Sequence, residues 1–253
     1  MVKISGRSVC GPGRTNNEDS FDYRFVGEHA VMAVADGLGG CPYGEVASSI
    51  AVSSSLGFIE QNSFLMDDED DMRQMLDRAF NAANIDILRD CVDNPGHMGM
   101  CSTLTVAVIT GTRLFIAHYG DCRCYLVHGS DFQQMTEDHN LAAYLVKTEG
   151  MTPEQASADA GRSRLINCLG ENKFVRPDVN IYNISYGDCV ILSSDGMYEL
   201  FDEDTRRMIL RNRNDLDRMC DLLMERGVSV DSKDNSTVVV ARVTPGRPEE
   251  SYE

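Results

Sequence analysis

The sequence of 253 residues predicts an α+β fold in which antiparallel sheets carry helices on their outer faces. Two observations lead to this prediction. Segments rich in Val, Ile, Thr and aromatic residues come in blocks, and neighbouring segments are joined by tight turns. Segments with an apolar residue every three or four positions separate these blocks. The regular βαβ alternation of a parallel sheet is therefore disfavoured.

Four apolar stretches are predicted to form strands, and one of them is long enough for several. They are residues 31–36, 102–127, 188–196 and 236–243. In the second stretch, Gly111-Thr112 predicts the first turn of a meander. The content of β-branched and aromatic residues suits a pleated surface that is buried on at least one side.

Helices are predicted between the strand blocks. Helical signals cover residues 44–60, Met72 to Cys91, the segment after Thr152 and Leu216 to Leu223. The second helix should end before Asn94-Pro95-Gly96, and the acidic run at 67–71 is typical of its first turn. Thr152 followed by Pro153 is typical of an N-cap and a first helical position.

The charge of the chain limits its partners. The formal net charge is −17, so nucleic acid and anionic membrane surfaces, which need a basic face, are not expected to bind. No apolar run approaches the ~18 residues of a membrane helix, and the first residues lack the apolar core of a signal peptide. We therefore expect a cytoplasmic protein and a monomer.

The nine cysteines do not form a metal or disulfide pattern. No C-x-x-C pair occurs, which makes a zinc knuckle or a redox pair of that type improbable. The chain also exceeds the usual size of disulfide-stapled scaffolds. Most of the cysteines are expected to be buried, reduced thiols.

Acidic residues stand at the ends of the predicted strands. Asp36, Asp121 and Asp195 follow apolar segments, and Asp234 precedes the last one. Each Asp alone is explained by a turn, because Asp-Gly is a common turn sequence. Together, they can converge at one edge of antiparallel sheets, where several carboxylates cannot all stay ionised without compensation. Cations would supply that compensation.

Oxygen ligands favour hard ions, so the expected cofactors are Mg²⁺ or Mn²⁺. The glycine after Asp36, Gly37, could contribute its carbonyl. Two such ions would attract a phosphate group to an acidic protein and activate a water molecule for attack on phosphorus. Near the N-terminus, Arg14 precedes Glu18 and Asp19, and its planar guanidinium suits two phosphate oxygens. A surface ion pair between Arg14 and Glu18 is the alternative interpretation.

An ordered set of motifs resembles a known family. The motifs are GRTNNED, ADGLGG, MCSTLTVAVI, YGDCRCYLV, TEDHNL, RLINCLG, SSDGMYEL and KDNSTVVVARV. In this order they resemble the metal-dependent serine/threonine protein phosphatases of type 2C, especially the bacterial stand-alone branch. The resemblance covers nearly the whole chain. It implies a four-layer α/β/β/α sandwich of two antiparallel sheets flanked by helices, with residues 1–243 as one catalytic domain and 244–253 as a polar tail.

The resemblance also implies roles for individual residues. Asp36 would bridge two metals, with the Gly37 carbonyl on one of them, and Asp195 and Asp234 would bind the other. Glu18 and Asp19 would hold metal-bound waters, and Asp121 with Asp195 would form a weaker third site. Arg14 would bind the substrate phosphate. Residues 139–178 would form a flap beside the cleft.

The implied activity is hydrolysis of phosphoserine and phosphothreonine in proteins by a metal-bridging hydroxide, with Arg14, Asp36 and Asp195 as the catalytic residues. The cofactors would be two or three Mn²⁺ or Mg²⁺ ions, and the partners would be phosphorylated proteins and a bacterial serine/threonine kinase that the enzyme opposes. Leu38 stands where many eukaryotic relatives carry a histidine, which leaves the acid for the leaving group unassigned.

The sequence disfavours three other interpretations. A dinucleotide-binding G-x-G-x-x-G pattern that starts at Gly37 meets Pro42 at its last position. Cys220 to Arg226 satisfies the C-x5-R spacing of cysteine phosphatases, but this segment is acidic, has no glycine and fits a helix. A non-catalytic binding module of the same fold is disfavoured because every expected carboxylate is present.

Overall fold

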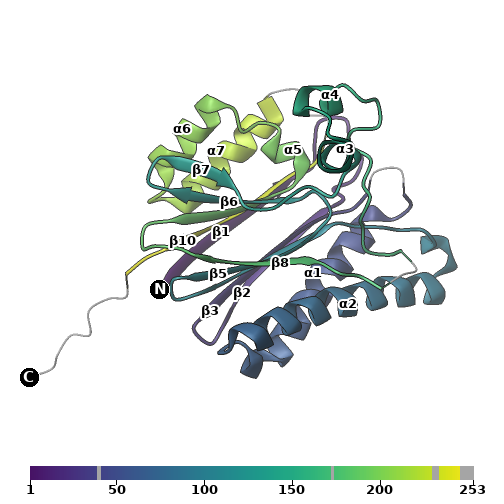
Figure 1. The fold of residues 1–253 in the computed structure, drawn as a ribbon, viewed down its shortest axis with the longest axis horizontal. Helices are drawn as coiled ribbons and strands as arrows, with labels where there is room; N and C mark the ends of the chain where they lie inside the picture. The colour runs from purple at the N-terminus through teal and green to yellow at the C-terminus, as the bar shows by residue number, and fades with distance from the viewer. Residues whose placement is uncertain (39–40, 172–173, 230–233, 246–253) are drawn as a thin grey trace, which may run out of the picture.

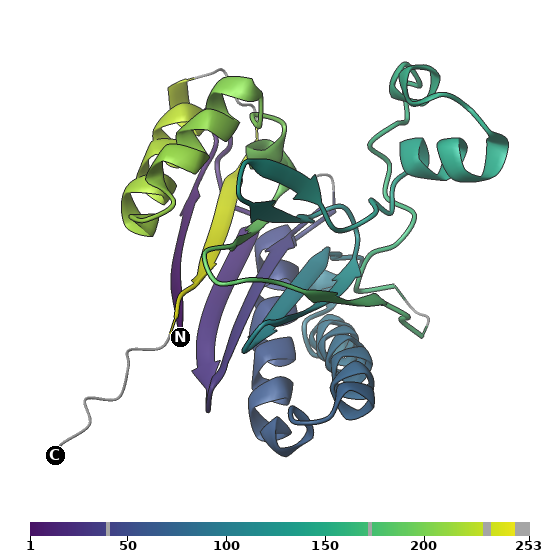
Figure 2. The same ribbon diagram turned by 60° about the vertical axis from the view of Figure 1, so that its left-hand side comes forward.

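Two five-stranded antiparallel sheets form the centre of the molecule (Figures 1 and 2). The computed structural model describes residues 1–38, 41–171, 174–229 and 234–245. One sheet has the order β1-β10-β9-β6-β7, and the other has the order β2-β3-β4-β5-β8. Each neighbouring pair is antiparallel. This arrangement confirms the predicted α+β class and the two antiparallel sheets.

The bounds of the elements are as follows. The strands are β1 Val2–Val9, β2 Asp19–Val26, β3 His29–Asp36, β4 Leu104–Thr110, β5 Arg113–Tyr119, β6 Arg123–His128, β7 Asp131–Gln134, β8 Asp178–Asn183, β9 Cys189–Ser193 and β10 Ser236–Val243. The α-helices are α1 Gly44–Gln61, α2 Glu69–Asp93, α3 Leu141–Glu149, α4 Pro153–Ser157, α5 Asp195–Tyr198, α6 Glu203–Asn212 and α7 Leu216–Ser229. Short 3₁₀ turns lie at Ser63–Leu65 and Pro95–His97.

Three apolar layers hold the sandwich together. One lies between α1, α2 and the sheet of β3 to β5, the second lies between the two sheets, and the third lies between the other sheet and α6 and α7. Strand β3 is almost entirely apolar because both of its faces are buried in these layers. Val31 and Ala33 face the first layer, whereas Met32 and Val34 face the second, because successive side chains point to opposite faces. Figure 1 shows the helices outside both sheets.

Most predicted elements are confirmed. Strands occupy all four predicted stretches, Gly111 lies in the turn between β4 and β5, and α1, α2 and α7 match the predicted helices. Asp68 caps α2 by accepting from Asp70 N–H and Asp71 N–H, and Thr152 forms a capping box at α4. Cys220 is fully buried on α7, so the C-x5-R match lies in a helix and is not a phosphate loop.

Four strands were not predicted from the sequence. They are β1, β2, β7 and β8, and each is an edge strand of its sheet. An edge strand pairs on one side only and tolerates polar residues, so its sequence lacks a long apolar run. The burial of β8 illustrates this, because none of its residues is fully buried.

The loops that carry the predicted flap stand apart from the sheets. In Figure 2 the segment with α3 and α4 extends from one end of the sandwich. Within the described ranges, no helix combines the length and the apolar character needed to cross a bilayer. Residues 246–253, most of the predicted tail, and Gly39 and Gly40 of the ADGLGG motif lie outside the described residues.

Candidate active site

The predicted carboxylates meet at one end of the sandwich. Asp36 ends β3, Asp121 follows β5, Asp195 begins α5 just after β9, and Asp234 precedes β10. β9 and β10 are antiparallel neighbours, so the end of the first strand lies beside the start of the second and brings Asp195 near Asp234. A cavity of about 410 Å³ is lined by these four residues and by Arg14, Glu18, Gly37, Leu38, Thr103, Ser163, Arg164 and Leu165.

Asp19 lies behind this cavity and does not line it. It is the pairing partner of Asp36 across β2 and β3 and is buried. Ser194 Oγ donates a hydrogen bond of 2.7 Å to Asp19 Oδ2. The structure therefore brings every predicted site residue into one region, with Asp19 in a supporting position.

The Asp36 backbone is held on both sides. Its N–H donates to Thr103 Oγ1 at 2.9 Å, and its carbonyl accepts from Thr103 N–H at 2.9 Å and from Ser102 Oγ at 3.0 Å. Gly37 N–H donates to the Glu18 carbonyl at 3.0 Å. These bonds tie the end of β3 to the start of β4 and to the N-terminal acidic motif, so the carboxylate at position 36 projects from a rigid support.

Two glycines allow segments to approach closely at the site. A Cβ atom at Gly37 would lie 2.1 Å from the carbonyl oxygen of Gly44, the first residue of α1. A Cβ atom at Gly196 would lie 2.1 Å from the carbonyl oxygen of Asn235. Both glycines follow an aspartate of the cluster, and any other residue would push these segments apart.

Burial and mutual repulsion raise the pKa values of the clustered carboxyl groups. Burial, and then nearby Asp195, raise the pKa of Asp121 to about 8. Burial and neighbouring aspartates raise the pKa of Asp19 to about 7 and that of Asp195 to about 6. The pKa of Asp36 lies well above its ordinary value for the same two reasons. A cluster of this kind favours either protons or cations.

Arg14 forms ion pairs with two acidic residues that line the cavity. Its Nη2 lies 2.7 Å from Asp234 Oδ1, and its Nη1 lies 3.4 Å from Glu18 Oε2. The alternative interpretation of Arg14 as a partner of Glu18 is therefore part of the observed arrangement. Arg14 and both of its partners line the cavity.

Oxygen donors for a hard cation are present. Asp19 Oδ1 and Asp195 Oδ1 are buried and make no hydrogen bond among the described residues. Buried carboxylate oxygens without partners are costly, and a divalent cation with oxygen ligands would satisfy them. As placed, the described His, Cys, Asp and Glu side chains contain no group of three or more that could hold a metal ion.

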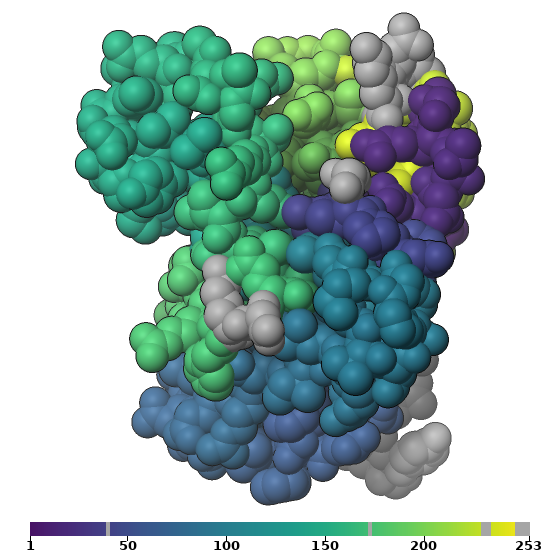
Figure 3. Space-filling view, turned by 90° about the vertical axis from the view of Figure 1, so that its right-hand side faces the viewer, coloured from purple at the N-terminus to yellow at the C-terminus, as the bar shows by residue number. Residues whose placement is uncertain are grey.

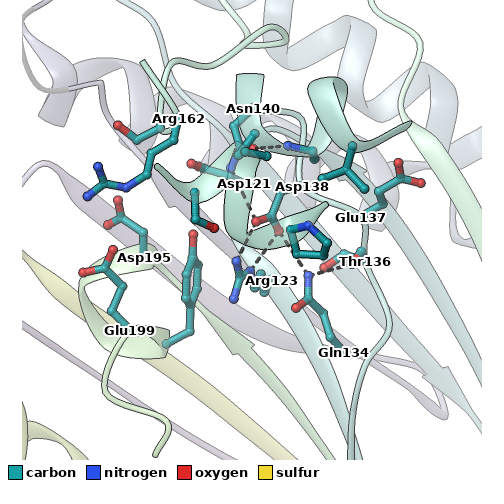
Figure 4. Close-up of a pocket in the computed structure, with 18 residues that line it drawn as sticks. Asp121, Arg123, Gln134, Thr136, Glu137, Asp138, Asn140, Arg162, Asp195 and Glu199 are labelled. Carbon is teal, nitrogen blue, oxygen red and sulfur yellow. Dashed lines mark hydrogen bonds and ion pairs between the residues drawn. The ribbon is translucent and has the colours of Figure 1, made fainter. Parts of the chain in front are cut away.

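A second cavity of about 650 Å³ adjoins the first and shares Asp121 and Asp195 with it (Figure 4). Its walls come from β6, β7 and α5 on one side and from α3, α4 and the loop after them on the other. Arg123 forms a two-point ion pair with Asp138 on its wall, with N–O distances of 2.8 and 2.6 Å. In Figure 3 the α3–α4 segment forms a separate lobe, with a hollow between it and the body of the molecule.

Sequence reasoning missed two arginines. Arg164 lines the cavity of the carboxylates, and Arg162 lines the adjoining cavity near Asp195 and Glu199 (Figure 4). The signal that could have revealed them is the triplet Arg162-Ser163-Arg164 inside the predicted flap of a strongly acidic chain. Their place beside the aspartates depends on how the flap folds back, which periodicity does not indicate.

Comparison with known families decides the classification. A family model described as Protein phosphatase 2C matches residues 10–233. The chain belongs to the protein phosphatase 2C family. Within this family, it is 32% identical over 248 residues to the serine/threonine protein phosphatase PstP of Mycobacterium tuberculosis, in a match that covers 96% of this chain and 45% of PstP. The chain thus spans about half the length of that curated relative.

Solved structures of protein phosphatase 2C relatives share the fold. The serine/threonine phosphatase Stp1 of Staphylococcus aureus has a TM-score of 0.88 at 26% identity, and the match covers 97% of this chain and 96% of Stp1. The catalytic domain of PstP in complex with two manganese ions has a TM-score of 0.76 at 31% identity, and the match covers 96% of this chain and 99% of that domain. The predicted family and fold are both confirmed.

The carboxylate cluster of this 2C-family protein predicts a pH-dependent stability. The pKa of Asp121 is about 8 in the folded state, against an ordinary value of 3.8. The folded state therefore binds the Asp121 proton more tightly than the unfolded state does. As the pH rises from about 4 towards 8, the unfolded state gives up this proton first, so the free energy of unfolding falls. Asp121→Asn cannot ionise. In EDTA at about pH 8.5, the variant should be more stable by about 1–3 kcal/mol, or several degrees in Tm.

Circular dichroism melts across this pH range will test the prediction. The Tm of the metal-free wild type should fall as the pH rises, and that of Asp121→Asn should fall less. Asp131→Asn, which changes an exposed carboxylate on β7, is the matched control and should follow the wild type. Equal Tm values for wild type and Asp121→Asn at alkaline pH would contradict the electrostatic account.

Proposed function

We propose that this chain is a metal-dependent phosphatase that hydrolyses phosphoserine and phosphothreonine in proteins. The observation that carries the proposal is the convergence of Asp36, Asp121, Asp195 and Asp234 beside Arg14 in one cavity. Membership of the protein phosphatase 2C family and the named activity of its relatives support the same function.

We assign metal binding to the carboxylates. Asp36, the Gly37 carbonyl, Asp195 and Asp234 would hold two Mn²⁺ or Mg²⁺ ions, and Asp121 with Asp195 would hold a third. Glu18 and Asp19 would act through water molecules. When bound there, the ions would supply the hydroxide nucleophile by lowering the pKa of water between them, and would offset the charge of the phosphate group.

The protein residues would orient the substrate. Arg14 would donate two hydrogen bonds to oxygens of the phosphate group, exchanging its present partners Glu18 and Asp234 for the substrate and so stabilising charge in the transition state. Leu38 lines the cavity but cannot donate a proton, so the serine or threonine oxygen that leaves phosphorus would take its proton from water and become a hydroxyl group. No side chain would become phosphorylated.

The adjoining cavity offers room for the protein substrate. Residues flanking a phosphoserine or phosphothreonine would lie between the β6–β7 wall and the flap of residues 139–178, which contributes Asn140 and Arg162. The catalytic domain would comprise residues 1–243. We further propose that the enzyme acts in the cytoplasm as a monomer and opposes a serine/threonine kinase.

Metal depletion is the direct test of this function. Protein stripped with EDTA should not hydrolyse a phosphothreonine peptide, and addition of Mn²⁺ or Mg²⁺ should restore turnover. Release of inorganic phosphate is the measurement. The same peptide with an unphosphorylated threonine serves as the blank. Well-folded protein that stays inactive with either ion would contradict the proposal and favour a binding module of the same fold.

A further inference from the structure

Three free thiols from distant parts of the chain meet next to the carboxylate site. Cys41 precedes α1, Cys101 precedes β4, and Cys168 lies near the end of the predicted flap. The side chain of Cys101 interacts with the side chains of both Cys41 and Cys168. Cys101 Sγ also donates to the Gly99 carbonyl at 3.5 Å, and Cys168 Sγ donates to Glu171 Oε1 at 3.6 Å. Cys41 and Cys101 are partly accessible, whereas Cys168 is buried. We call these three residues the thiol cluster.

The thiol cluster is connected to the backbone that carries Asp36. Leu38 N–H donates to the Cys101 carbonyl at 3.0 Å, and Cys41 N–H donates to the Leu38 carbonyl at 3.1 Å. Next to Cys101, Ser102 Oγ donates to the Asp36 carbonyl. A change in the position of Cys101 would therefore be transmitted to the loop that follows Asp36.

The thiol cluster also connects the flap to the sheet. Leu169, next to Cys168, exchanges two backbone hydrogen bonds with Ser102, with N–O distances of 2.7 and 3.1 Å. A covalent bond between Cys101 and Cys168 would thus join the flap to the segment that precedes β4. This segment includes Ser102, which is hydrogen-bonded to the Asp36 carbonyl.

We propose that the thiol cluster is an oxidant-responsive modification site, in which hydrogen peroxide converts Cys101 and one neighbouring thiol of the cluster into a disulfide. The Cys101 thiolate attacks a peroxide oxygen, so that an S–O bond forms, the O–O bond breaks and hydroxide leaves as water after protonation. Cys101 becomes a sulfenic acid. The neighbouring thiol then attacks this sulfur, an S–S bond forms, and the hydroxyl group leaves as a second water molecule.

Two further observations single out Cys101 as the thiol that reacts first. The neighbouring side chains of Cys168 and Cys41 lower its pKa to about 7, whereas the pKa values of both neighbours are raised. A larger thiolate fraction and partial exposure are what peroxide requires. By contrast, Cys122, Cys124, Cys189 and Cys220 are buried, with raised pKa values.

Disulfide formation should lower turnover. An S–S bond of about 2.05 Å is much shorter than a non-bonded contact between two thiols, so the backbone at Cys101 must shift to close it. Because that backbone positions Leu38 and Ser102, the shift would disturb Asp36. If the proposed phosphatase function holds, on which this effect rests, we expect about a tenfold or greater loss of turnover that a dithiol reductant reverses.

Peptide mapping tests the chemistry without any assay of activity. Reduced, EDTA-treated protein is exposed to hydrogen peroxide, alkylated, digested and analysed by mass spectrometry. We expect a crosslinked peptide pair that contains Cys101 and either Cys41 or Cys168, lighter by about 2 Da than the two reduced peptides. Cys101→Ser should abolish the crosslink. Cys10→Ser, which removes an exposed thiol outside the cluster, is the matched control and should leave it unchanged.

The outcomes separate this proposal from the proposed function. Peroxide that leaves Cys101 reduced, or that oxidises Cys10 in its place, would overturn the modification site whether or not the protein is a phosphatase. A Cys101 disulfide that leaves Mn²⁺-dependent turnover unchanged would overturn the link to activity. Reduced protein that lacks turnover in every metal would count against the proposed function, and the peptide map would still decide the fate of the thiol cluster.

Discussion

Asp195→Asn is expected to lower metal-dependent turnover by about 100-fold or more while the protein stays folded. Asp195 is shared by both cavities, and its Oδ1 is a buried oxygen that no described residue hydrogen-bonds. In our assignment it contributes to two metal sites, so the amide would weaken both. The fold should tolerate the change, because burial and Asp234 raise the pKa of Asp195 to about 6 and the variant removes this repulsion.

The measurement is peptide hydrolysis by EDTA-stripped protein with added Mn²⁺, beside calorimetric titration of the metal. Asp131→Asn is the matched control, since it makes the same chemical change at an exposed residue that lines neither cavity. A circular dichroism melt verifies folding. An Asp195→Asn protein with near-normal turnover would show that our ligand assignment is wrong.

Arg14→Ala should reduce kcat/KM for a phosphopeptide by about 10- to 100-fold, as expected from the loss of charge-assisted hydrogen bonds to phosphate. Metal affinity should change less, since Arg14 donates no ligand and its removal frees Asp234 and Glu18 from their ion pairs with it. Steady-state kinetics and metal calorimetry together separate the two effects.

Arg14→Lys is the informative companion variant. Lysine keeps the charge but lacks the planar fork that can bind two phosphate oxygens, so it should recover only part of the lost kcat/KM. Equal damage to metal binding and to phosphopeptide hydrolysis in Arg14→Ala would contradict a role in phosphate binding and favour a purely structural ion pair.

The central strands show how much of the fold was predictable. β3, β4, β9 and β10 are buried on both faces, so each is a nearly continuous apolar run that can be recognised without a partner. The four edge strands carry no such signal, since their polar residues are compatible with loops as well as with strands. They become strands because a neighbour supplies the hydrogen bonds.

The candidate site was likewise predictable only in part. Asp36, Asp121, Asp195 and Asp234 were identifiable because each stands at the end of a recognisable strand and belongs to an ordered motif. Their meeting in one cavity depends on the antiparallel pairing of strands that are far apart in the sequence. The raised pKa values follow from that meeting and not from any local pattern.

The sequence by itself determined the family, the antiparallel α+β class and the carboxylates that we assign to metal, because these depend on apolar runs and motifs that each segment carries alone. Only the tertiary structure decided the edge strands, the place of Arg162 and Arg164 beside the aspartates, the pairing of Arg14 with Asp234, and the contact of Cys41, Cys101 and Cys168. The physical reason is that sheet pairing and the path of the flap set these distances, and contacts between distant segments leave no periodic signal in the chain.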